Sequence, residues 1–145
     1  MGTLTGIYGE PLELLRTILQ GSSAFAAFSA DTAVHLYQRI GIATATEVGD
    51  AWAVVSWKED GHSIGLLGGL QAVRVAEIAF VRAVDQFTEA AKEDIINDVS
   101  AVVSDIINAD AAQDVVERVV LHGFAIDEDT EPPSIGATVR VYMGI

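Results

Sequence analysis

Two stretches of the chain and its scattered histidines contain the residue types that bind ions or act as nucleophiles. The densest is an acidic cluster near the C-terminus, formed by Asp127, Glu128, Asp129 and Glu131. Carboxylate oxygens are ligands that Ca²⁺ prefers. The cluster lacks the Asp-x-Asp-x-Asp-Gly order and the distant glutamate of a helix-loop-helix calcium site. We therefore interpret it as a solvated acidic turn and predict no metal site there.

The glycine-rich stretch at 61–71, GHSIGLLGGLQ, invites comparison with a phosphate loop and with a catalytic pair. It has neither the Lys-Ser/Thr ending of a phosphate-binding loop nor the spacing of a dinucleotide loop. His62 and Ser63 are adjacent in the chain, and adjacent side chains rarely point at each other as a base and its nucleophile must. We interpret the stretch as a flexible loop that binds no cofactor.

The histidines and cysteines give no further support for catalysis. The three histidines, His35, His62 and His122, lack the helical two-histidine spacing that holds a metal. The chain has no cysteine, which excludes disulfides, Cys-ligated zinc and thiol catalysis. We predict no catalytic residues, no cofactor and no enzyme activity. The alternative, a small acidic enzyme or ligand-binding domain, would require a pocket in which histidines and carboxylates converge.

Charge and hydropathy limit the partners. Eight Lys and Arg against 21 Asp and Glu give a net charge of −13, which repels nucleic acid, so we expect no nucleic-acid recognition. No apolar run is long enough for a membrane helix, and the N-terminus lacks the features of a signal peptide. Half of the residues are apolar. That fraction fits either a surface buried against partners or a core rich in Ala and Val, and both readings stay open.

The run at 73–109 contains no glycine or proline and could form one helix or a strand followed by a helix. Apolar residues in its second half recur at spacings of three and four, which predicts an amphipathic helix at about 88–109 with Thr88 as N-cap. The first half, 73–84, is rich in Val, Ile and Phe, which favours a strand. A single helix of this length would be unusual in a domain of this size.

The remaining patterns predict two helices, one at 11–20 that begins at Pro11 and a short one after Ser22 or Ser23. They also predict strands at 33–40, 50–60, about 115–127 and 135–144. Trp52 and Trp57 should face opposite sides of their strand. The fold class is then α+β. One domain, 1–145, has a mixed or antiparallel sheet flanked by the N-terminal helix and the long amphipathic helix.

Several segments together resemble a known family. They are the N-terminal LELLRTILQGSSAF, the central AWAVVSW, the run RVAEIAFVRAVDQFTEAAKEDIINDVSAVVSDIINA, and the final VVERVVLHGFAID and GATVRVYMGI. In this order they resemble the tail terminator, or tail-completion, proteins of long-tailed bacteriophages. These are small α+β proteins without a catalytic signature. Head-closure and neck adaptor proteins of phages have a similar size and are the alternative.

The resemblance implies a structural virion protein. Such a protein forms a homo-oligomeric ring, typically a hexamer, that caps the tail tube, stops its polymerisation and joins the tail to the head connector. Its partners would be further copies, the tail-tube protein and the head-closure or connector protein. Its place would be the tail or neck of the virion, after synthesis in the host cytoplasm. A closed ring joins one surface of each subunit to a different surface of the next.

We expect the contact surfaces in the strand around Trp57, in the loop at 61–71 and in the terminal strand, which we interpret as an edge of the sheet. The candidate interface residues are Trp57, His62, Leu66, Leu67, Val139, Val141 and Tyr142.

Overall fold

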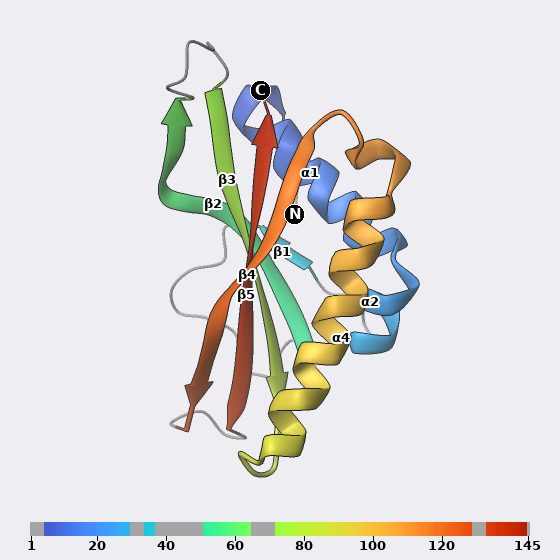
Figure 1. Ribbon diagram of the computed structural model, residues 1–145, viewed down its shortest axis with the longest axis vertical. Helices are drawn as coiled ribbons and strands as arrows, with labels where there is room; N and C mark the ends of the chain where they lie inside the picture. Colours follow the sequence, from blue (N-terminus) through green and yellow to red (C-terminus); the bar gives the residue numbers. More distant parts are fainter. Residues whose placement is uncertain (1–4, 30–33, 37–50, 65–71, 129–132, 145) are drawn as a thin grey trace.

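The computed structural model describes residues 5–29, 34–36, 51–64, 72–128 and 133–144 of the chain. In chain order the elements are α1 (Gly6–Gly21), α2 (Ser23–Phe28), β1 (Val34–Leu36), β2 (Ala51–Ile64), β3 (Ala72–Ala83), α4 (Glu89–Asn108), the 3-10 turn η1 (Asp110–Ala112), β4 (Val116–Asp127) and β5 (Ser134–Gly144). The predicted α+β class and order of elements are confirmed, with η1 as an addition (Figure 1).

The five strands of the described ranges form one mixed sheet in the order β1-β2-β3-β5-β4. β1 runs parallel to β2, and the other neighbours are antiparallel. The prediction that the C-terminal strand is an edge is wrong, because β5 pairs with β3 on one side and with β4 on the other. The edge on that side of the sheet is β4. The order of strands along the chain does not fix their order in the sheet, and this is the source of the error.

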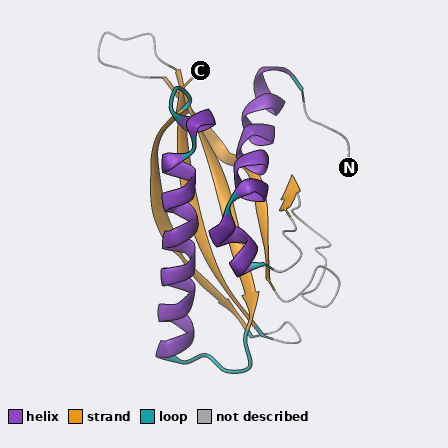
Figure 2. Cartoon of the chain, turned by 90° about the vertical axis from the view of Figure 1, so that its right-hand side faces the viewer, coloured by secondary structure: helices purple, strands orange, loops and turns teal. Residues whose placement is uncertain are grey.

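The stretch that we predicted as a strand, 73–84, forms β3 at Ala72–Ala83. Ala76, Ile78 and Phe80 are buried and belong to the core, whereas Glu77 and Ala79 on the other face are partly exposed. The helices α1, α2 and α4 cover the same face of the sheet, as Figure 2 shows with the helices in front. Two of the apolar side chains on the other face of the sheet, Trp52 and Val75, are buried as well.

The long amphipathic helix is confirmed as α4. Its apolar stripe, Ile95, Val99, Val102 and Ile106, is buried against the sheet. The Thr88 side chain caps the helix by accepting a hydrogen bond from the Ala91 N–H at 3.1 Å. Such a cap satisfies one of the free N–H groups of the first turn.

The end of β2 differs from the prediction. β2 continues through Gly61 to Ile64, so the predicted turn at Gly61 is wrong. Pairing with β3 maintains the strand there, across an irregularity between Trp57 and His62. The described part of the predicted strand at 33–40 is β1, and residues 37–40 and 65–71 lie outside the described residues.

A carboxylate connects the α2 cap to α4. Asp105 Oδ2 accepts from the Ser22 hydroxyl at 2.6 Å and from the Ala24 N–H at 3.3 Å. The Ser22 hydroxyl in turn accepts from the Phe25 N–H at 3.0 Å and so caps α2.

We expect Asp105→Ala to lower the free energy of unfolding by about 1–3 kcal/mol, because the part-buried Ser22 hydroxyl and Ala24 N–H lose a charged acceptor. Urea denaturation followed by circular dichroism measures this change. Asp94→Ala, at an exposed aspartate of the same helix, is the matched control and should change stability little. Equal losses from both variants would show that the contact with Ser22 contributes nothing.

Candidate assembly surface

The structure places the predicted interface residues of the terminal strand mainly inside the molecule. Val139 and Val141 are fully buried in the hydrophobic core, so their side chains are not available to a partner in this fold. Tyr142 points to the other face of the sheet and is partly exposed. The Arg118 guanidinium covers its ring at 4.1 Å. These two valines are buried because β5 is paired on both sides and is not the edge strand that the sequence predicts.

The other predicted interface residues lie on β2 or outside the described part of the chain. Trp52 and Trp57 do face opposite sides of β2, since Trp52 pairs with Val81 and Trp57 with Ala76. Trp57 is partly buried against the core. His62 belongs to β2, although its side chain is not described, and Leu66 and Leu67 lie outside the described residues.

α1 begins at Gly6, well before the predicted start, and Pro11 lies inside it. A proline inside a helix lacks the N–H that would bond to the carbonyl one turn earlier, here that of Ile7. The Arg74 guanidinium donates to this carbonyl instead. The Trp57 indole N–H donates to the neighbouring Tyr8 carbonyl at 2.7 Å. These two donors from the sheet explain why the helix includes a turn on the N-terminal side of Pro11.

Arg74 is the centre of this attachment. It is 4% exposed, and its guanidinium carbon lies 5.0 Å from the ring centroids of both Tyr8 and Trp57. A guanidinium between two aromatic faces is held by cation–π attraction and by its hydrogen bond together. Gly6, at the start of the turn, has a φ of 80°, which favours glycine. The first turn of α1 is therefore fixed to the sheet.

The edge strand β4 has exposed apolar side chains on both faces. Leu121, 46% exposed, pairs with core-facing Val139, so it lies on the helix face. Val120, 43% exposed, pairs with Arg140 and lies on the opposite face. Phe124 and Ile126 are exposed to a similar degree, and both pair with core-facing residues of β5. Our sequence interpretation identified the strand but missed this surface.

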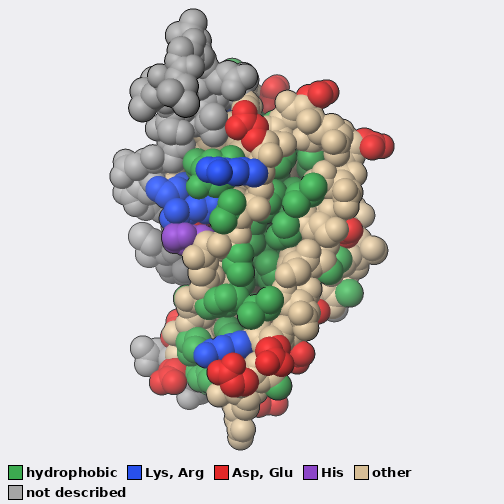
Figure 3. All heavy atoms as spheres, viewed as in Figure 1, with side chains coloured by type: hydrophobic (Ala, Val, Ile, Leu, Met, Phe, Trp, Pro, Cys, Tyr) green, Lys and Arg blue, Asp and Glu red, His purple; other side chains and the backbone are tan. Residues whose placement is uncertain are grey.

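A groove lies between α4 and β4, with a volume of about 160 Å³. We call it the α4–β4 groove, and its lining residues are Ile96, Val99, Ser100, Val103, Leu121 and Val139. The Ser100 hydroxyl donates to the Ile96 carbonyl at 2.6 Å, so the one polar side chain of the lining is already bonded within the helix. Figure 3 shows a column of hydrophobic side chains on this side of the molecule.

The titratable groups give no sign of a reaction centre in the described ranges. His122 Nε2 lies 3.1 Å from Arg140 Nη2 on the face of the sheet away from the helices. Because arginine is only a donor, the histidine nitrogen accepts in this pair. Among the residues that the structure describes, no three His, Asp or Glu side chains are grouped to hold a metal. A larger hollow of about 490 Å³ between the C-terminal ends of α1 and α4 contains the bonded Asp105.

None of the helices in the described ranges is both long and apolar enough to cross a membrane.

Comparisons with known proteins bear on the fold. No protein-family model and no curated protein sequence matches this chain. The fold is similar to that of a chain in a solved structure of the virion of a native gene transfer agent particle, with a TM-score of 0.53 and 15% sequence identity. The match covers 92% of this chain and 94% of that chain. At this identity the likeness establishes a shared fold over nearly the whole length of both chains.

Proposed function

We propose that this protein is a structural, non-enzymatic component of a virion. It forms a homo-oligomeric ring, a hexamer, that caps a tail tube, stops tube polymerisation and joins the tail to the head connector. The observation that carries the proposal is the agreement of two independent likenesses. The sequence resembles phage tail terminator proteins, and the fold matches, over 92% of the chain, a chain from a gene transfer agent virion.

The edge strand supports assembly on physical grounds. A long edge strand with exposed apolar side chains is an aggregation hazard for a monomer. Proteins remove that hazard by covering the edge, and a ring covers it with the next subunit. The irregularities in the β4–β5 pairing, at Val116/Arg118 and at Leu121/Gly123, disturb the ladder along this strand. Such bulges discourage strand addition, so we assign the contact to the side chains of β4 and its groove.

We expect the purified chain to form ring-shaped particles with a mass of about six times 15.3 kDa. Light scattering on a sizing column gives the mass, and negative-stain images of the same fractions show the shape. The measurement is made over a range of concentrations and repeated with the tail-tube protein of the same virion, because some rings close only on their partner. Tube length in the presence of the chain measures whether polymerisation stops.

A chain that stays monomeric at high concentration, and that neither binds tube protein nor limits tube length, would overturn the proposal. Rings that bind the connector but leave tube length unchanged would instead support a neck or head-closure adaptor.

A further inference from the structure

Ile7 and Tyr8 are the most exposed of the large hydrophobic residues that the structure describes, at 64% and 56%. We call this pair the α1 knob. The two residues are adjacent on the first turn of α1. An exposed apolar pair of this kind gains free energy when a partner removes it from water. Because the knob lies at the end of a helix, it can enter a concave surface of a partner.

The knob is also rigid. The Ile7 carbonyl accepts from Arg74, the Tyr8 carbonyl accepts from Trp57, and the Tyr8 ring lies beside the Arg74 guanidinium. Ordering side chains and loops at an interface opposes binding, and a preorganised anchor avoids most of that cost. Trp57 therefore acts on assembly indirectly, as a positioning residue for the knob.

The α4–β4 groove is an apolar concavity elsewhere on the same chain. Trp57 of β2 and Arg74 of β3 hold the knob, and β5 lies between β3 and β4, which forms one wall of the groove. The knob therefore lies outside the surface that surrounds the α4–β4 groove of the same chain. A protruding apolar group and a complementary pocket elsewhere on one molecule make a head-to-tail contact between copies.

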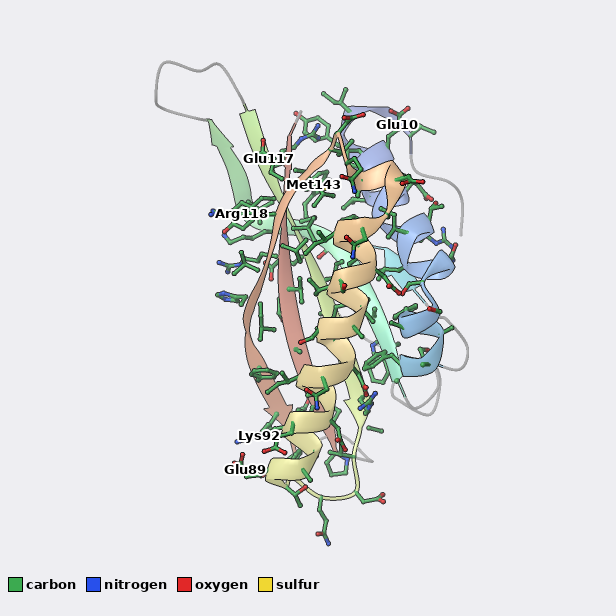
Figure 4. All side chains as sticks on the ribbon, turned by 45° about the vertical axis from the view of Figure 1, so that its right-hand side comes forward. Glu10, Glu89, Lys92, Glu117, Arg118 and Met143 are labelled. Atoms are coloured by element: carbon green, nitrogen blue, oxygen red, sulfur yellow. The ribbon has the colours of Figure 1, made fainter. Side chains whose placement is uncertain are left out.

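We propose that the α1 knob of one copy docks in the α4–β4 groove of the next copy, and that this is the contact that builds the ring. The inference deepens the proposed function and rests on it. The occupant is a second copy because one chain carries both complementary surfaces. The contact is apolar, since Arg118 of β4 covers Tyr142 on the face of the sheet opposite the groove and points away from α4 (Figure 4).

Two variants disable one surface each. Ile7→Asp removes the knob, and an acidic residue in the first turn suits the helix dipole, so α1 should stay folded. Leu121→Asp places a charge in the groove. The matched controls are Thr17→Asp, at an exposed site on α1, and Val120→Asp, which changes the neighbouring residue of similar exposure on the other face of β4. Ile96→Asp is a second groove variant, used if Leu121→Asp does not fold by circular dichroism.

Each disabled variant should lose the ring and elute as a monomer under conditions in which the wild-type chain forms rings, while both controls keep the ring. A mixture of the two disabled variants should form dimers of about twice 15.3 kDa and nothing larger. One intact knob then meets one intact groove, and the other surfaces of that dimer are disabled.

The possible failures are distinguishable. Wild-type rings together with rings from folded Ile7→Asp or from a folded groove variant would overturn this inference and leave the proposed function standing. A mixture that stays monomeric would overturn it too, because the two surfaces then do not meet. If the wild-type chain forms no ring, either alone or with tube protein, the inference and the proposed function both fail.

Discussion

Phe80→Ala is expected to lower the free energy of unfolding by about 3–5 kcal/mol, the usual cost of truncating a buried aromatic residue. Phe80 of β3 is fully buried. Its ring meets Phe25 and Phe28 edge-on, with centroids 6.3 and 5.7 Å away. Edge-to-face pairs add to the effect of area alone. Because a domain of this size has about 5–15 kcal/mol in total, the variant should be close to unfolding.

Chemical denaturation followed by fluorescence of Trp52 and Trp57 measures the loss. Phe124→Ala is the matched control, since it makes the same substitution at a side chain on β4 that is 43% exposed. We expect this control to keep most of its stability. A loss at Phe80 no larger than that at Phe124 would contradict the packing around the three phenylalanines.

Local patterns predicted the elements well. The period of α4 and the β-branched run of β3 are properties of neighbouring residues, so both were recognisable without the structure. Thr88 was identified as a cap for the same reason, since a cap acts on the N–H groups that directly follow it. The start of α1 was predicted too late because Pro11 is normally found in the first turn. Compensation by Arg74, on a distant strand, is not visible in the local pattern.

The candidate surface depended on distant pairings, and the prediction that β5 is an edge strand is wrong. Val139 and Leu121 both belong to apolar strands, and the sequence patterns do not indicate which of the two strands lies at the edge of the sheet. Only the pairing of β5 with both β3 and β4 buries the first and exposes the second. The apolar residues on both faces of β4 are the one sequence feature that could have indicated this surface. An edge strand with such a pattern needs a partner on its surface, whereas a central strand with the same pattern does not.

Arg74→Met is expected to cost about 2–4 kcal/mol, since a hydrogen bond to a charged group contributes about 1.5–3 and a cation–π contact about 0.5–1. It leaves the Ile7 carbonyl without the donor that replaces the missing N–H of Pro11. The first turn of α1 should then fray. Hydrogen exchange should speed up at the amides of Glu10 and Leu12, whose helical acceptors lie in that turn. Ring formation should weaken although both knob residues are unchanged.

Two further variants separate this positioning role from a general loss of stability. Arg74→Lys keeps the charge but lacks the planar fork that both stacks on rings and donates, so it should rescue little. Arg82→Met removes an arginine near the other end of β3, together with its ion pair to Asp98 and its contact with the Phe28 ring. It should destabilise the fold without raising exchange at Glu10 and Leu12. If Arg82→Met weakens the ring as much as Arg74→Met at equal stability, then the fixed knob does not direct assembly.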